Sequence, residues 1–323
     1  MKFFVVMLFA LLLVACERDS SPVNTYAKTS VDMKLVQVSE HTWYVKGASG
    51  VATDNEGFIS NAGVVITDNS VIVFDALGTP SLAQKLLEEI RKITDKPVTK
   101  VIVSHYHADH IYGLQVFKDI GAKIHVPAGA DEYLSSETSR ERLEERRFSL
   151  DPWVNESTRL VKPDYYYEKG ESFTEGGVTM TVSLVGAAHS DGDLTLYVDT
   201  DQVLFSGDII FEGRIAFLGD ADTRHWLQTL ERMETSELKA LIPGHGSAAA
   251  DPNQAIGQMR RYLAFLRKIM TDAFENLQSF DEVYDEVDWS EFSHLPAFNE
   301  ANRRNAFQVF LSIEREQIEL EQQ

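Results

Sequence analysis

Three histidines and an aspartate fall within six consecutive positions of this chain, at His105, His107, Asp109 and His110. Polar side chains packed this densely must be solvated or bound to something, because burying them without partners costs free energy. Neutral imidazole nitrogens and ionised carboxylates are good ligands for zinc, iron or manganese. The density and order of these residues therefore favour a metal site over a surface loop that happens to be polar.

The residues before this cluster predict an element that could hold it. The run from Val98 to Val103 is rich in β-branched residues and predicts a buried strand that ends just before the histidines. Ligands that leave a rigid strand are positioned better than ligands on a free loop.

The pattern His-x-His-x-Asp-His-x-x-Gly, which runs from His105 to Gly113, resembles the signature of the metallo-β-lactamase superfamily. The resemblance covers roughly residues 36–250, because three later segments each combine a strand, small residues and one metal-type ligand. These ligands are His189, Asp208 and His245. The resemblance implies a fold of the α/β class, a four-layer αββα sandwich, here followed by a C-terminal helical extension.

The resemblance also implies how these seven side chains divide between two metal ions. One ion would be bound by His105, His107 and His189, the other by Asp109, His110 and His245, with Asp208 bridging both. This set is similar to the dinuclear site of glyoxalase II, because a histidine ends the signature and a bridging carboxylate is present. We expect two zinc ions, with iron or manganese as alternatives.

The expected chemistry follows from the charge of two divalent cations. They lower the pKa of a shared water, so a metal-bridging hydroxide would serve as the nucleophile. Asp109 is the candidate catalytic residue, expected to orient the hydroxide and to shuttle a proton. Asp75, at the end of an apolar strand, is expected either to orient ligands from behind or to cap the adjacent loop. We predict a hydrolase of a small ester, thioester or amide.

Three other functions remain open on the sequence. A class B β-lactamase fits the family, although the chain has no cysteine for the second metal and does have Asp208. A mononuclear iron enzyme that oxidises persulfides would keep the same histidines. A non-catalytic binding module would have no need of all seven ligands. Residues 55–61 and 295–302, together with the signal peptide, carry a narrower resemblance. They resemble exported zinc hydrolases linked to sulfur oxidation or quinoprotein pathways.

The sequence does not show which residues contact a substrate. Arg214, Arg224 and His225 follow the Gly207-Asp208 strand, and they could contact an anionic group or lie at the surface.

The N-terminus predicts export. Lys2 and the apolar run from Phe3 to Ala15 form a signal too short to span a membrane as a mature helix. The sequence Leu-Val-Ala-Cys ending at Cys16 resembles the lipobox of bacterial lipoproteins, which implies cleavage before Cys16 and lipidation of its thiol. Glu17 follows, which favours the outer over the inner membrane. We expect a lipid-anchored protein of the bacterial periplasm or cell envelope.

Composition limits the partners. The chain has 323 residues, of which 44% are hydrophobic, and a formal net charge of −20. This acidity opposes binding to nucleic acid or to anionic membrane surfaces. The expected partners are a small-molecule substrate and, through the lipid anchor, a membrane. Cys16 is the only cysteine, so the chain offers neither an intrachain disulfide nor a thiolate ligand.

Four regions are expected along the chain. They are a lipoprotein signal peptide (1–15), a flexible tether (16–34), a metallo-β-lactamase domain (35–250) and a C-terminal helical extension (251–323). Several of the elements expected inside them are tested below: a strand over 58–66, an edge strand over 123–127, one solvated helix over 131–148, a loop containing 165–167, a strand that starts at 203 and ends in 206–208, and extension helices over 254–277 and from 296.

Overall fold

The computed structural model describes residues 26–219, 221–233 and 238–321. The predicted signal peptide, the lipobox and Cys16 lie outside the described residues. Within those ranges, none of the helices combines the length and the apolar character needed to cross a membrane.

Two β-sheets form the centre of the domain. The seven-stranded sheet has the order β1-β2-β3-β4-β5-β6-β7 and the five-stranded sheet has the order β12-β11-β10-β9-β8. The first sheet consists of β1 (Leu35–Gln37), β2 (Thr42–Val45), β3 (Ala62–Ile66), β4 (Val71–Phe74), β5 (Val98–Ile102), β6 (Lys123–Pro127) and β7 (Tyr165–Tyr167). The second consists of β8 (Glu171–Glu175), β9 (Val178–Gly186), β10 (Asp193–Val198), β11 (Val203–Phe211) and β12 (Ala240–His245).

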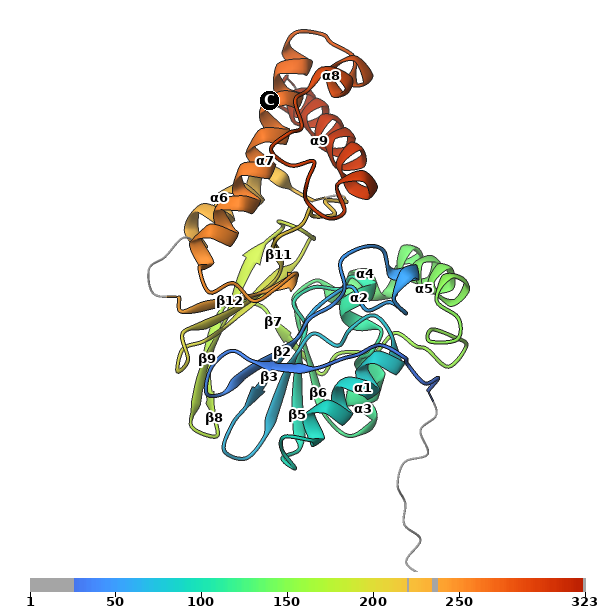
Figure 1. Ribbon diagram of the computed structural model, residues 1–323, viewed down its shortest axis with the longest axis vertical. Helices are drawn as coiled ribbons and strands as arrows, with labels where there is room; N and C mark the ends of the chain where they lie inside the picture. The colour runs from blue at the N-terminus through green and yellow to red at the C-terminus, as the bar shows by residue number, and fades with distance from the viewer. Residues whose placement is uncertain (1–25, 220, 234–237, 322–323) are drawn as a thin grey trace, which may run out of the picture.

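Helices cover the outer face of each sheet (Figure 1). The first sheet carries α1 (Pro80–Arg91), α2 (Ala108–Ile111), α3 (Leu114–Asp119), α4 (Ala130–Ser135) and α5 (Glu137–Ser149). The second carries α6 (Thr223–Met233) and α7 (Pro252–Glu275). A short 3-10 helix, η1 (Ala52–Asp54), lies between β2 and β3.

The alternation of β4 shows why the layers form. Val71 and Val73 face the core under the helices, whereas Ile72 and Phe74 face the second sheet, as the two-residue period of a strand requires. Between the sheets the ring of Phe74 stacks on that of Phe205, with centroids 5.3 Å apart. Apolar residues on both faces of a strand are typical of a sheet that is covered twice. The predicted αββα sandwich is confirmed.

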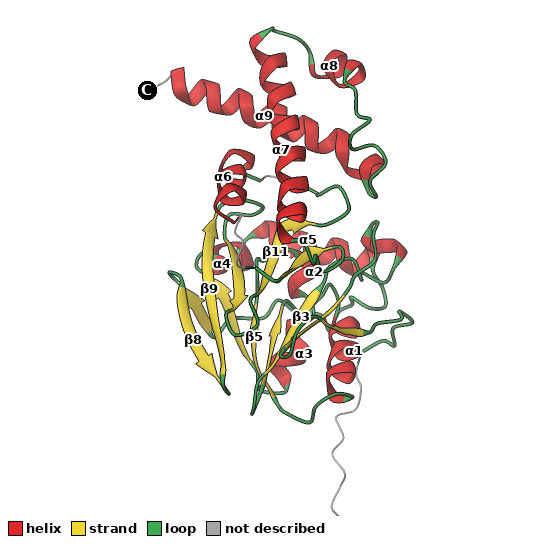
Figure 2. Ribbon diagram, turned by 60° about the vertical axis from the view of Figure 1, so that its left-hand side comes forward, coloured by secondary structure: helices red, strands yellow, loops and turns green. Residues whose placement is uncertain are grey.

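The C-terminal helices extend beyond the sandwich (Figure 2). The two predicted helices are confirmed as α7 and α9 (Phe298–Glu321). Between them, α8 (Phe280–Glu286) lies in a stretch rich in acidic residues, where the sequence analysis expected no helix. Ser279 and Glu282 form a capping box at its start, in which each side chain bonds the backbone N–H of the other residue. The acidic residues therefore belong to a capped helix.

Five of the other expected elements need correction. The strand expected over 58–66 begins only at Ala62, because residues 58–60 form a turn and the N–H of Asn61 bonds the carbonyl of Gly244 in β12. The strand over 123–127 is not an edge, because β7, expected to be a loop, pairs with it. The helix expected over 131–148 is two helices, the second capped by Ser136. Finally, β11 does not end in 206–208 but continues to Phe211.

Gly113, which ends the histidine signature, lies where two segments of backbone approach closely. A Cβ there would lie 1.9 Å from the carbonyl oxygen of Ala76 and 2.5 Å from Cβ of Ala83. We expect Gly113→Ala to lower the free energy of unfolding by about 3 kcal/mol, because the backbone at Ala76 must shift to make room for the new methyl group. Urea denaturation measures this change.

The control is Gly257→Ala in α7, where the nearest atom to a new Cβ is the flexible end of Arg261 at 3.4 Å. This variant is expected to gain about 1 kcal/mol, because alanine favours a helix interior over glycine. Equal midpoints for the two variants would contradict the prediction.

Candidate metal centre

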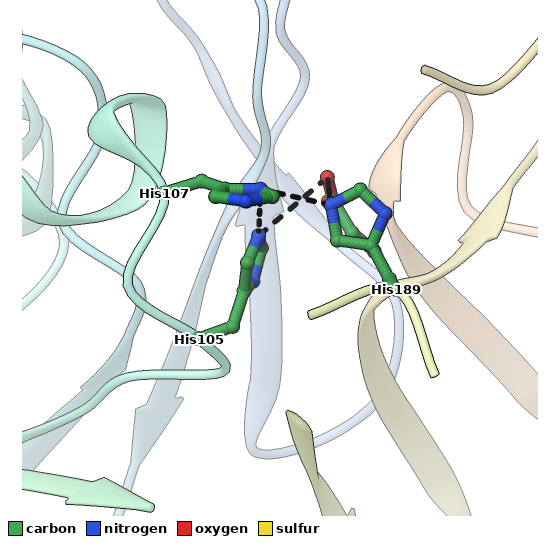
Figure 3. Close-up of side chains that lie close together, drawn as sticks. His105, His107 and His189 are labelled. Atoms are coloured by element: carbon green, nitrogen blue, oxygen red, sulfur yellow. Dashed lines mark hydrogen bonds and ion pairs between the residues drawn. The ribbon is translucent and has the colours of Figure 1, made fainter. Parts of the chain in front are cut away.

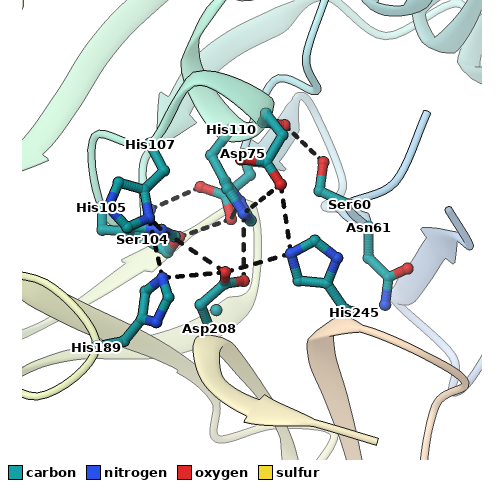
Figure 4. A network of polar contacts seen from close by, with 12 residues as sticks. Ser60, Asn61, Asp75, Ser104, His105, His107, His110, His189, Asp208 and His245 are labelled. Carbon is teal, nitrogen blue, oxygen red and sulfur yellow. Dashed lines mark hydrogen bonds and ion pairs between the residues drawn. The ribbon is translucent and has the colours of Figure 1, made fainter. Parts of the chain in front are cut away.

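All seven predicted ligands meet at one end of the two sheets, and Figure 4 labels all of them except Asp109. They form two groups, and within each group the ligand atoms lie within 4.8 Å of one another. The first group contains His105, His107, His189 and Asp208, and the second contains Asp109, His110 and His245. The loop after β5 and helix α2 supply four of these side chains, the β9–β10 loop supplies His189, and β11 and β12 supply Asp208 and His245.

The first group is organised around His107 (Figure 3). Its Nδ1 lies 3.0 Å from Nε2 of His105 and 2.9 Å from Nε2 of His189. Three imidazole nitrogens therefore converge on one point, although His107 uses a different ring nitrogen from the other two.

Asp208 lies between the two groups. Its Oδ2 is 3.2 Å from Nε2 of His189 and 3.2 Å from Nε2 of His245. Its Oδ1 is 3.2 Å from Nε2 of His110, yet both of these buried atoms lack a hydrogen-bond partner among the described residues. Lone pairs that converge without forming a hydrogen bond are what the ligands of a shared cation present. The donor set therefore fits divalent metal ions.

Hydrogen bonds behind the ligands fix the direction of three rings. Nδ1 of His110 lies 2.9 Å from the carboxylate of Asp75, and Nδ1 of His105 lies 2.9 Å from the hydroxyl of Ser104. Ser104 in turn donates to Asp75 from its backbone N–H at 2.7 Å and from its hydroxyl at 2.8 Å. Nδ1 of His245 donates to the carbonyl of Ile59 at 2.7 Å. Each bond leaves Nε2 facing the site. Of the two roles considered for Asp75, its position favours orientation of ligands.

Asn61 holds the strand end that carries His245, and the sequence analysis did not single it out. Its side-chain amide donates to the carbonyls of Pro243 and Gly246 at 2.8 and 2.9 Å. The adjacent Gly244 must lack a side chain, because a Cβ there would lie 1.9 Å from Oδ1 of Asp208. The only sequence signal was a polar Ser-Asn pair inside an otherwise apolar run.

Asp193 is a second residue that the sequence analysis missed. Its buried carboxylate accepts hydrogen bonds from the backbone N–H groups of Ala188 and Ser190, at 3.1 and 2.9 Å, and from the Ser190 hydroxyl at 2.8 Å. Burial raises the pKa of Asp193 to about 7, although these bonds oppose the rise. The contacts close the turn that presents His189.

The three residues considered for substrate contacts are placed differently. Arg214 is only 3% exposed, so a surface position is wrong for it. The Arg224 side chain is 62% exposed, with Glu316 3.8 Å away. Nδ1 of the half-buried His225 lies 2.7 Å from the carbonyl of Ala187.

The electrostatics of the cluster suit cation binding. Burial lowers the pKa of His105 well below its ordinary value and that of His189 to about 3, so both rings are neutral ligands. Burial alone would raise the pKa of Asp208, but His245, His110 and His189 hold it well below its ordinary range. Against the effect of burial, the carboxylates raise the pKa values of His110 and His245. A cation bound here would compete with a proton for the Nε2 atoms of those two rings.

Comparison with known protein families shows which family this chain belongs to. Residues 55–245 match the model of the metallo-beta-lactamase superfamily, a span that contains every ligand described above. The chain belongs to the metallo-beta-lactamase superfamily. At the level of reaction class, membership makes it a metal-dependent hydrolase.

Individual relatives are distant. A type 2 metallo-beta-lactamase of Elizabethkingia meningoseptica is 24% identical over 228 residues, which cover 69% of this chain and 82% of the relative. A type 2 metallo-beta-lactamase of Bacillus cereus is 24% identical over 223 residues, which cover 66% of this chain and 77% of the relative.

Two solved structures support the same fold. A metallo-beta-lactamase from Pontibacter korlensis has a TM-score of 0.56 at 18% identity, covering 72% of this chain and 99% of its own. An inverting sec-alkylsulfatase from Pseudomonas sp. has a TM-score of 0.66 at 20% identity and covers 86% of this chain. This chain spans only 50% of the alkylsulfatase. The superfamily model and both structures confirm the metallo-β-lactamase fold without fixing a substrate.

Proposed function

We propose that the protein is a dinuclear zinc hydrolase of a small ester, thioester or amide. The observation that carries the proposal is the position of Asp208, whose oxygens lie 3.2 Å from histidines of both ligand groups. A site for one ion would need only one of these groups. Five imidazoles and two carboxylates form a set in which nitrogen predominates, which suits zinc better than magnesium or calcium.

The bound ions would polarise the scissile carbonyl and make a water nucleophile available near neutral pH. Of the two candidate ligand carboxylates, Asp109 is the one better placed to accept a proton from the attacking water and pass it on. Its side chain is 21% exposed whereas that of Asp208 is 4% exposed, and its Oδ2 lies 3.3 Å from Nε2 of His245. Ser60 donates to the backbone carbonyl of Asp109 at 2.5 Å, which holds this residue at the edge of the cluster. Asp109 can therefore meet a substrate from which Asp208 is shielded.

Metal analysis joined to a hydrolysis assay tests the proposal. We expect about two zinc ions per chain, loss of 4-nitrophenyl butanoate hydrolysis after removal of metal with a chelator, and recovery when zinc is restored. Full hydrolysis by metal-free protein would contradict the proposal. One iron per chain with oxygen consumption would instead support an enzyme that oxidises persulfides.

β-Lactam hydrolysis is the second candidate, and the named relatives favour it, since they are metallo-beta-lactamases. A β-lactam is a cyclic amide, so the same site could hydrolyse it. The two candidate ligand groups consist of histidines and aspartates, which departs from lactamase subclasses that hold the second metal with a cysteine and favours the wider ester, thioester and amide class. A chromogenic cephalosporin assayed beside the ester separates the two, because faster turnover of the cephalosporin would favour the lactamase.

A further inference from the structure

Residues 26–34, which precede β1, pack against the domain, and we call them the N-terminal strap. Met33 is buried in the core that lies under the helices of the first sheet. The indole N–H of Trp153 donates to the carbonyl of Lys28 at 3.2 Å. The strap also bonds the side chain of Glu56, in the loop between β2 and β3. It therefore joins this loop to the body of the domain.

Glu56 binds the strap with both of its carboxylate oxygens. The residue is only 9% exposed. The backbone N–H of Ser30 donates to both oxygens at 3.1 Å, and the hydroxyl of Thr29 donates to one of them at 2.5 Å. The hydroxyl of Ser30 donates to the other. A buried carboxylate is costly unless its oxygens accept such bonds, so the strap holds this side chain in one place.

The backbone of Glu56 adopts a left-handed conformation, with a φ of 59°. Residues that carry a Cβ seldom adopt this conformation, and it persists only where surrounding contacts hold it. Gly57 follows with a φ of 83°, and then the buried Phe58, whose carbonyl accepts from the N–H of Ala48 at 2.8 Å. Only these two residues separate Glu56 from Ile59. A shift of Glu56 would therefore move Ile59 as well.

Ile59 and Ser60 contact the second ligand group directly. The carbonyl of Ile59 accepts from Nδ1 of His245 at 2.7 Å. The hydroxyl of Ser60 donates to the backbone carbonyl of Asp109 at 2.5 Å (Figure 4). Neither bond involves a histidine of the first group. The loop that Glu56 fixes is thus connected to one of the two groups and not equally to both.

We propose that Glu56 is a positioning residue for the second metal ion. The strap holds Glu56, and Glu56 holds the loop. Through Ile59 the loop sets the direction of the His245 ring, and through Ser60 it sets the place of Asp109. Partners behind metal ligands affect metal affinity without touching the metal. The inference rests on the proposed function, because that function assigns this group a zinc ion of its own.

Zinc titration of the metal-free protein against a chromophoric chelator tests the proposal. The wild type should bind zinc in two steps, and Glu56→Gly should weaken one step about tenfold while the other stays within about twofold. Glycine removes the carboxylate but suits a positive φ, so the variant loses backbone strain together with the contact to the strap. His245→Ala identifies the step that belongs to the second group, because it removes a ligand of that group.

Leu277→Gly is the matched control. Leu277 also has a positive φ, of 55°, and is 93% exposed, so glycine there should leave both zinc steps unchanged. Thr29→Val combined with Ser30→Ala removes two hydroxyl donors and leaves Glu56 intact. It should weaken the same step as Glu56→Gly by a smaller factor, because the N–H of Ser30 remains. This pair also tests the proposal if Glu56→Gly does not fold.

Three results would overturn the inference alone. They are equal weakening of both steps in Glu56→Gly, wild-type zinc binding in Glu56→Gly with a lowered melting temperature, and wild-type zinc binding in the variant that lacks both hydroxyls. Each would limit Glu56 to a role in stability or separate it from the strap. A single zinc step in the wild type would instead overturn the proposed dinuclear site, and this inference with it.

Discussion

Asp208→Ala is expected to reduce kcat/KM for ester hydrolysis at least about 10³-fold, which corresponds to ~4 kcal/mol of transition-state stabilisation. The same variant should bind no more than about one zinc ion. The reason is that, among the carboxylates that the structure describes, this buried one alone contacts histidines of both ligand groups, at 3.2 Å in each case. Without Asp208, the group that contains His110 and His245 no longer shares a carboxylate with the first group, so a second cation is bound more weakly.

Metal content by elemental analysis and steady-state kinetics measure the two effects together. The control is Asp199→Ala, which removes a partly exposed carboxylate between β10 and β11 that accepts a hydrogen bond from Thr181 at 2.9 Å. It should keep both metal ions and full activity. If Asp208→Ala retained two zinc ions and its hydrolysis rate, Asp208 would not bridge the ions.

The seven residues that cluster here could be predicted from the sequence as candidate ligands because each carries a local signal. His105 follows a β-branched strand directly, and His189, Asp208 and His245 each occur among small residues at or near a strand end. Strands of one sandwich bring such positions to a common edge. A short-range pattern was therefore enough to find residues more than a hundred positions apart.

The residues that support the ligands gave no comparable signal. Asn61 bonds Pro243, which is 182 positions away, and the hydroxyl of Ser60 bonds Asp109, which is 49 positions away. Such contacts depend on how the two sheets pack, and neither partner shows them in its own neighbourhood. The same holds for the buried Arg214, whose loop is bonded by Pro296 and Asn305 of the helical extension. Sequence spacing predicts what a segment can do, whereas burial depends on what packs against it.

Some errors in the fold have a similar cause. Tyr165–Tyr167 is three residues long and forms a strand only because it pairs with His125–Pro127. The break between α4 and α5 depends on Ser136, whose hydroxyl accepts from the N–H of Ser139 at 3.0 Å. A run of alternating charges predicted the helix but concealed this cap.

Asp75→Asn is expected to lower zinc affinity and activity about 10- to 100-fold, the usual effect of losing a partner behind a metal ligand. The Asp75 carboxylate accepts bonds from the Ser104 N–H at 2.7 Å and the Ser104 hydroxyl at 2.8 Å, and its Oδ2 lies 2.9 Å from Nδ1 of His110. An asparagine keeps one acceptor oxygen but turns an amide group towards a donor, so one contact becomes repulsive. The ring of His110 then loses its fixed direction.

Zinc titration with kinetics distinguishes this role from a loss of folding. If Asp75 orients His110, excess zinc should restore most of kcat in Asp75→Asn, because the defect lies in metal affinity. Ser104→Ala is the matched control, since it removes only the hydroxyl and leaves the bond between Asp75 and His110, and we expect a loss of at most about tenfold. Wild-type zinc affinity in Asp75→Asn would refute the orienting role. A loss that excess zinc does not restore, with a lowered melting temperature, would assign Asp75 to the stability of the strand end.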